Sequence, residues 1–152
     1  MSLSGERIRC SRAWEADETP PHALPGDRPV WTRDRTVDVK HIKIDIKLDL
    51  ENRRVSGTAT HTVAPLNDDS RFAEFDAIDM EISSVNVARK PAEFTYDGAK
   101  LRVDLGAGRK RGQDLPVAIG YSATPRIGMY FIHPDEGYPD KPVQVWTQCQ
   151  DE

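Results

Sequence analysis

The sequence predicts an all-β fold, a mostly antiparallel β-sandwich, and three observations carry this prediction. Short apolar runs recur along the chain with turn-forming residues between them. Several of these runs alternate apolar and polar residues, which is the pattern of a strand with one buried face. No window of about 11 or more residues keeps the helical period of about 3.6 residues. Repeated short strands separated by turns are typical of sandwiches and barrels.

The clearest alternation follows His41, where apolar residues are separated by Lys and Asp. This run predicts a half-buried strand. After the polar turn 51–53, alternation resumes over 55–63 with threonines on one face, so the two runs predict an antiparallel hairpin. The apolar positions of the first run are Ile42, Ile44, Ile46, Leu48 and Leu50.

Shorter runs predict the remaining strands. The alternation breaks between Ile82 and Val85, which predicts a β-bulge. The pair Asp97-Gly98 suits the positive-φ positions of a tight hairpin turn. The predicted strands cover 71–75, 81–88, 94–96, 101–105, 115–121, 128–132 and 143–150.

Two regions are predicted. Residues 1–36 hold several prolines, many charges and no apolar period, so we interpret them as a tail, disordered or in the form of an extended arm. Residues 37–152 are predicted to form the sandwich.

Bulk properties restrict the partners and the location. The formal net charge is −4, with both signs interspersed, so no basic stripe for nucleic acid is present. No apolar run approaches the roughly 18 residues of a membrane span, and the start lacks the apolar segment of a signal peptide. Cys10 and Cys149 do not form a disulfide framework. We therefore expect no nucleic acid or membrane partner and a cytoplasmic location.

Catalytic signatures are absent from the sequence. It contains no His-Glu-x-x-His, Cys-x-x-Cys, Gly-rich phosphate loop or Gly-x-Ser-x-Gly. His133, Asp135 and Glu136 are a conceivable metal cluster, but they flank a turn without a fourth ligand, which favours a solvated loop. His61 fits a hydrogen-bonded histidine at a core edge, and Cys149 a core-facing free cysteine. We therefore predict no catalytic residue and no metal ligand in this chain.

The end of the chain holds the candidate substrate-binding residues. If a strand continues through them, Gln148 and Gln150 project from one face, about 6.6 Å apart at ~3.3 Å per residue. Adjacent amides offer the donors and acceptors that a peptide backbone or an α-amine requires. The alternative is an ordinary exposed polar face.

Four segments between Val37 and Glu152 together resemble the N-terminal domain of the aminopeptidase N family of zinc metallopeptidases, which includes the leukotriene-hydrolase branch. Their order and spacing carry the resemblance. They are Asp38-Val39-Lys40-His41, Val55-Ser56-Gly57-Thr58-Ala59-Thr60, Gly128-Met129-Tyr130-Phe131, and Tyr138-Pro139-Asp140-Lys141-Pro142 leading to Gln144-Val145-Trp146-Thr147-Gln148-Cys149-Gln150.

The resemblance implies a saddle-shaped sandwich that packs on a following, thermolysin-like catalytic domain, and by the same resemblance the chain is expected to end before that domain. That domain would carry the Gly-Ala-Met-Glu-Asn and His-Glu-x-x-His motifs and bind zinc, and neither motif occurs here. By the same resemblance, Gln148 lines the pocket for the first substrate side chain. Gln150 stands where the family often has the carboxylate that binds the substrate's α-amine. The implied partners are a peptide N-terminus and the catalytic domain of the same chain.

Two other hypotheses remain open at this stage. The chain could be a free-standing β-sandwich that binds a protein partner through the turn near Gly137 or through an edge strand. A longer parent could also keep the scaffold without the catalytic motif. The fragment alone is expected to be inactive, and its cut face is expected to leave apolar residues bare and promote association.

Overall fold

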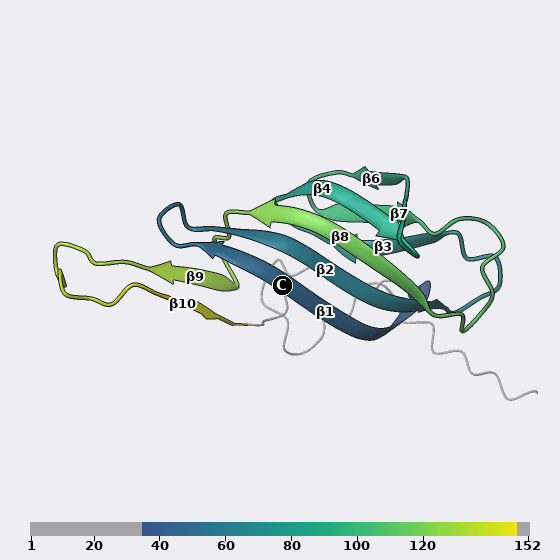
Figure 1. The fold of residues 1–152 in the computed structure, drawn as a ribbon, viewed down its shortest axis with the longest axis horizontal. Coiled ribbons are helices and arrows are strands. Elements are labelled where there is room, and N and C mark those ends of the chain that lie inside the picture. Colours follow the sequence, from purple (N-terminus) through teal and green to yellow (C-terminus); the bar gives the residue numbers. More distant parts are fainter. Residues whose placement is uncertain (1–34, 149–152) are drawn as a thin grey trace, which may run out of the picture. The chain divides into compact units, whose positions relative to one another are not determined.

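A computed structural model describes residues 35–148, and these residues form ten strands and no helix (Figure 1). A five-stranded sheet has the order β1-β2-β8-β4-β5, a second sheet has the order β3-β7-β6, and β9 and β10 form a separate pair. Every strand pairing is antiparallel. The predicted all-β, antiparallel fold is therefore confirmed. The described part contains no helix long and apolar enough to cross a lipid bilayer.

The long hairpin predicted from the alternating runs is confirmed. β1 (Val37–Asp49) pairs with β2 (Arg54–Pro65) from Val37↔Pro65 to Asp49↔Arg54. In the turn, the Asp49 carboxylate accepts hydrogen bonds from the backbone N–H and the side-chain amide of Asn52, at 3.0 and 2.8 Å. Gly57 lies opposite Ile46, and a Cβ there would approach the backbone oxygen of Asp45 to 2.1 Å. Only glycine therefore allows this close approach of β1 and β2.

The other strands of the large sheet follow β2. β8 (Leu115–Ala123) pairs with β2 on one side and with β4 (Met80–Val87) on the other. The predicted bulge in β4 is confirmed, because the register shifts between Ile82 and Ser84. A second shift, between Val39 and His41 in β1, was not predicted.

The short outer strand β5 (Lys90–Pro91) was also not predicted from the sequence. Val87 pairs with Lys90, so a two-residue turn joins β4 to β5. Ala88 and Arg89 in this turn have φ values of 49° and 67°. Such turns usually contain Asn or Gly, so Ala-Arg gave no turn signal in the sequence.

The smaller sheet is made of β3 (Phe72–Asp76), β7 (Lys100–Asp104) and β6 (Phe94–Tyr96). The predicted β6–β7 hairpin is confirmed, with Gly98 at φ 95°. Asp97 acts differently from the prediction, because it is not at positive φ and its carboxylate instead accepts the N–H groups of Ala99 and Lys100, at 2.9 and 2.6 Å.

The core lies between the two sheets. The larger sheet contributes mainly β-branched residues of β2, β4 and β8, and the smaller sheet contributes β3 and β7. The Tyr96 hydroxyl ties the sheets together where the chain crosses between them, because it donates to the Ala77 carbonyl (2.8 Å) and accepts from the Met80 N–H (2.9 Å). The core residues are Val37, Val63, Ala73, Ala77, Val85, Val87, Leu101, Val103, Leu105, Leu115, Val117 and Ile119.

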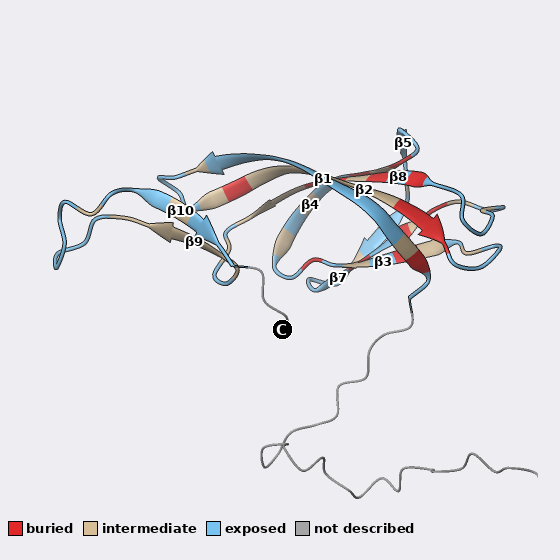
Figure 2. Cartoon of the chain, turned by 90° about the horizontal axis from the view of Figure 1, so that it is seen from below, coloured by how far each residue is buried: buried red, intermediate tan, exposed pale blue. Residues whose placement is uncertain are grey.

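The prediction that the first long strand is half-buried is wrong. Its apolar side chains at 42, 44, 46 and 48 are 39–60% exposed. Figure 2 shows β1 almost entirely in the colour of exposed residues, whereas buried residues gather on β2, β8 and the smaller sheet. The alternating pattern identified the apolar face correctly, but the three-stranded sheet does not extend over it.

The structure describes only part of the two regions predicted from the sequence. The tail assigned to 1–36 lies almost entirely outside the described residues and stays a prediction.

The contrast between the core and β1 predicts different costs of truncation. Leu101 is 0% exposed, and Leu101→Ala is expected to lower the free energy of unfolding by about 2–5 kcal/mol through lost burial and a cavity. Ile44 is 60% exposed, and Ile44→Ala is expected to cost less than about 1 kcal/mol. Urea unfolding at low protein concentration measures both, and equal losses would contradict the exposure of β1.

Candidate functional site

The segment that carries the candidate substrate-binding residues follows a separate hairpin. β9 (Met129–Ile132) pairs with β10 (Gln144–Thr147), with Gln144 opposite Ile132 and Thr147 opposite Met129. Trp146 lies opposite Tyr130, and their rings stack with centroids 4.4 Å apart and planes inclined by 19°. A cross-strand aromatic pair stabilises a two-stranded ribbon that has little other support.

Gln148 lies directly after β10 and is exposed. Its backbone N–H donates to the carbonyl of Gly128 at 2.9 Å, which extends the β9–β10 pairing by one contact. Gly128 has φ 81°, so the chain turns sharply just before β9. The hairpin therefore fixes the backbone of Gln148. The sequence predicted a strand that continues through this residue, whereas β10 ends one residue before it, at Thr147.

The second candidate, Gln150, lies outside the described residues, as does Cys149. Whether the two amides project from one face is therefore not decided by the structure. The substrate-binding role of Gln148 and Gln150 stays a prediction.

The loop between β9 and β10 uses its acidic residue for its own structure. The Asp135 carboxylate accepts the N–H of Tyr138 at 2.9 Å and pairs with Lys141, while Asp135 and Tyr138 also form an isolated β-bridge. The Lys141 ammonium, followed by the Tyr138 N–H, holds the pKa of Asp135 below its usual value. This carboxylate therefore closes the turn.

An apolar hollow of about 360 Å³ lies between the sheets beside β1. Its walls include Ile42 of β1, His61 of β2 and Phe75 of β3. The His61 and Phe75 rings lie 4.9 Å apart with planes inclined by 47°. Partial burial lowers the pKa of His61, because removal from water disfavours the imidazolium. The expected place of His61, at the edge of the core, agrees with this arrangement.

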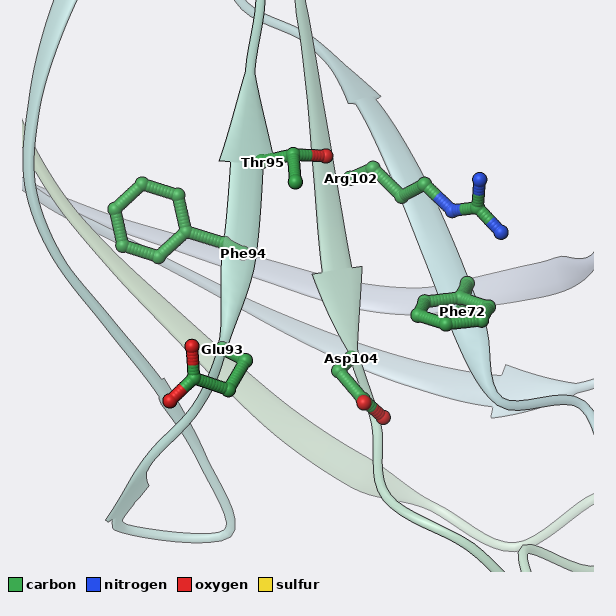
Figure 3. A pocket seen from close by; sticks show the side chains of 6 residues that line it. All are labelled: Phe72, Glu93, Phe94, Thr95, Arg102 and Asp104. Atoms are coloured by element: carbon green, nitrogen blue, oxygen red, sulfur yellow. The ribbon is translucent and has the colours of Figure 1, made fainter.

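A second hollow, of about 310 Å³, lies on the smaller sheet (Figure 3). The Arg102 guanidinium lies 4.0 Å from the centroid of the Phe72 ring, while Arg71 pairs with Asp104 at 2.7 Å. This pairing with Arg71 and the N–H of Gly106 lower the pKa of Asp104. Figure 3 shows Phe94 pointing away from Phe72 and Arg102, so the lining side chains do not converge on one point. The Asp104 carboxylate is thus already paired within the fold.

The residues that line the two hollows assemble no metal-binding group. Among residues 35–148, no three His, Cys, Asp or Glu side chains lie together in a way that could hold a metal ion. The cluster considered at His133, Asp135 and Glu136 is therefore not assembled as a metal site.

Neither hollow was predicted from the sequence. Only His61 gave a signal, because it interrupts an otherwise apolar face of β2. Phe72 and Arg102 belong to strands that become neighbours through the chain's topology, and no local pattern reports such a pairing.

Two curated proteins are similar in sequence to this chain. No family model matches the chain. It is 21% identical over 118 residues to leucine aminopeptidase 2 of Phaeosphaeria nodorum, covering 73% of this chain and 19% of that protein. It is 23% identical over 120 residues to leukotriene A-4 hydrolase of Xenopus laevis, covering 74% of this chain and 20% of that protein.

A solved structure shares the fold. An M1 zinc metallopeptidase of Deinococcus radiodurans, crystallised with a Tyr-Ser-Ala substrate, superposes with a TM-score of 0.55 at 20% identity, covering 71% of this chain and 24% of that one. The resemblance to zinc aminopeptidases that the sequence predicted is confirmed. The chain spans about one fifth of the length of the curated relatives it matches.

His61 predicts a pH dependence of stability. Its pKa is lowered from 6.5 in the folded state, so the unfolded chain binds a proton more readily. Its contribution to stability is therefore present above about pH 6.5 and falls as the pH drops from there towards the folded pKa. Carboxylates with lowered pKa values, such as Asp104, lose their contribution only near and below about pH 4.

The test is urea unfolding between about pH 7 and pH 5, where histidine titrates. His61→Gln is expected to flatten the decline, whereas His41→Gln, at an exposed position of β1, is expected to keep it. An unchanged slope in His61→Gln would contradict the assignment.

Proposed function

We propose that this chain is the N-terminal, non-catalytic domain of a zinc-dependent aminopeptidase that removes N-terminal residues from peptides. In this proposal Gln148 and Gln150 orient the substrate, and a further domain of the same protein performs the hydrolysis. The location proposed for the whole protein is the cytoplasm.

The observation that carries the proposal is the backbone position of Gln148. The β9–β10 hairpin is a two-stranded ribbon, and its last contact, from the Gln148 N–H to Gly128, holds Gln148 at the point where the chain leaves the described sheets. A residue whose backbone is held by hydrogen bonding can orient a ligand with less loss of entropy than a free one. The similarity to an aminopeptidase and to a peptide-bound metallopeptidase supports a peptide as the ligand.

The two amides suit a peptide N-terminus. An amide oxygen accepts a hydrogen bond from an ammonium group, and an amide N–H donates to a peptide carbonyl. A neutral acceptor binds an ammonium less strongly than a carboxylate does, because charge-assisted hydrogen bonds are roughly twice as strong. The proposal therefore assigns part of the amine recognition to an acidic residue of the catalytic domain.

Zinc does not fit the residues described here. Since residues 35–148 assemble no group that could hold a metal ion, the proposal assigns the zinc ligands, and the general base, to the further domain. The role proposed for this chain is binding and orientation.

One observation favours a second candidate function, a protein-interaction module without an enzymatic partner domain. The exposed apolar residues of β1 form the kind of surface that a protein partner covers. Reading the parent gene distinguishes the two: a downstream His-Glu-x-x-His supports the aminopeptidase, and an intact gene without it supports the module.

The proposal predicts selective losses in the parent enzyme. Gln148→Ala and Gln150→Ala are each expected to lower kcat/KM for a dipeptide substrate about tenfold, the effect of one or two lost hydrogen bonds. Gln144→Ala is the control, because this exposed glutamine begins β10, at the end of the strand far from Gln148. Wild-type kcat/KM in both site variants would refute the assigned roles.

A charge introduced at position 150 tests amine recognition separately. Gln150→Glu is expected to lower the inhibition constant of an amino-acid amide severalfold, since a carboxylate binds the ammonium more strongly than an amide does. The N-acetyl analogue lacks that ammonium and is expected to gain nothing. Equal effects on both inhibitors would show that residue 150 does not contact the amine.

A further inference from the structure

The first strand of the large sheet has an open edge. β1 is the outermost of the five strands and is 13 residues long (Figure 1). No strand among residues 35–148 pairs with its outer side. An exposed edge of this length presents a row of backbone donors and acceptors that can pair with another strand.

Beyond its first residues, β1 lacks the proline and the bulge that often protect an edge strand. It contains no proline, and its one register shift lies near its start, between Val39 and His41. From residue 42 onwards the pairing with β2 is regular. A single-sign row of lysines would repel a second strand, but the polar face of β1 alternates Lys43, Asp45, Lys47 and Asp49.

We propose that β1 is a self-association edge, at which the β1 strands of two copies of this chain pair antiparallel across a two-fold axis at Ile46. The pairing joins two five-stranded sheets into one continuous sheet. This inference goes beyond the proposed function and does not depend on it.

The charge pattern of β1 is complementary in this register. With the axis at Ile46, Lys43 lies opposite Asp49 of the second copy and Asp45 opposite its Lys47, so the four charges from residue 43 onwards each face an opposite charge. On the other face, Ile46 lies opposite itself and Ile44 opposite Leu48. Opposite charges and apolar pairs directly across an antiparallel ladder are both favourable.

Neighbouring registers are disfavoured by the same charges. Moving the axis by one residue, to Asp45 or Lys47, places Lys opposite Lys and Asp opposite Asp. A two-fold axis that runs along the strands makes them parallel and turns one sheet over, so apolar and polar side chains would share a face. The antiparallel arrangement at Ile46 is therefore favoured over these alternatives.

The monomer offers little resistance to this pairing. Lys43 and Asp45 form an ion pair at 2.7 Å within β1, but both side chains are about two-thirds exposed, at 65% and 68%. Exposed ion pairs contribute little, so exchanging this one for pairs across the new ladder costs little. The apolar side chains of β1, already 39–60% exposed, lose contact with water where they meet their counterparts.

The experiment is sedimentation velocity of the complete 152-residue chain over a range of concentrations. Wild type is expected to show a reversible monomer–dimer equilibrium. Asp45→Lys places Lys against Lys47 of the second copy, and Lys47→Asp places Asp against Asp45. Each variant is expected to raise the dimer dissociation constant about tenfold or more, since two contacts per dimer become repulsive.

Mixing the two variants tests the register itself. An Asp45→Lys strand and a Lys47→Asp strand are again fully complementary, so the mixture is expected to form a heterodimer with a dissociation constant within about threefold of wild type. The double variant D45K/K47D is expected to dimerise like wild type. Lys90→Asp, on the outer strand at the opposite edge of the sheet, is the control and is expected to leave dimerisation unchanged.

Three results would overturn the proposal. Wild type could remain monomeric at its highest soluble concentration. The single variants could dimerise as tightly as wild type, which would show that the contact lies elsewhere. The mixture could stay monomeric like its components, which would exclude the register at Ile46. Thermal unfolding of each variant confirms that the fold is retained before the comparison is made.

Discussion

The structure depends on a mismatch between two sheets. A three-stranded sheet packs on a five-stranded one, and the apolar contact between them forms the core. Because the smaller sheet is narrower, it buries β-branched residues of β2, β4 and β8 and leaves most of β1 uncovered. The apolar hollow beside His61 lies where that cover stops. Core, hollow and exposed strand are thus three consequences of one packing arrangement.

The same mismatch explains which parts of the fold could be predicted from the sequence. Alternation in β1 and β2 identified both strands, their hairpin and the apolar face, and the break after Ile82 identified a bulge. These features are local. Whether the apolar face is covered depends on the width of a sheet formed by distant residues, so β1 was wrongly predicted to be half-buried. β5 was missed because Ala88-Arg89 adopts a turn that its residue types do not favour.

The candidate site shows a similar division. The residue types and spacing at the end of the chain singled out Gln148, and the structure adds a backbone hydrogen bond to Gly128 that no sequence pattern reports. The stacked pair Tyr130 and Trp146 stabilises the ribbon that leads to it. The hollows, by contrast, combine side chains from six strands beside β1 and from three strands on the smaller sheet, and only the topology brings such residues together. In this chain, local chemistry was readable from sequence and assembled surfaces were not.

Gly57 limits which residues a homologous sequence can carry at this position of β2. A side chain at this position would meet the backbone of β1 and not a movable side chain, so no rotamer change relieves the clash. A relative that carries a larger residue here must therefore have separated β1 from β2 at this point, or must have lost the pairing locally. A residue other than glycine at this position of a homologous sequence thus indicates an outer strand held less closely than in this protein.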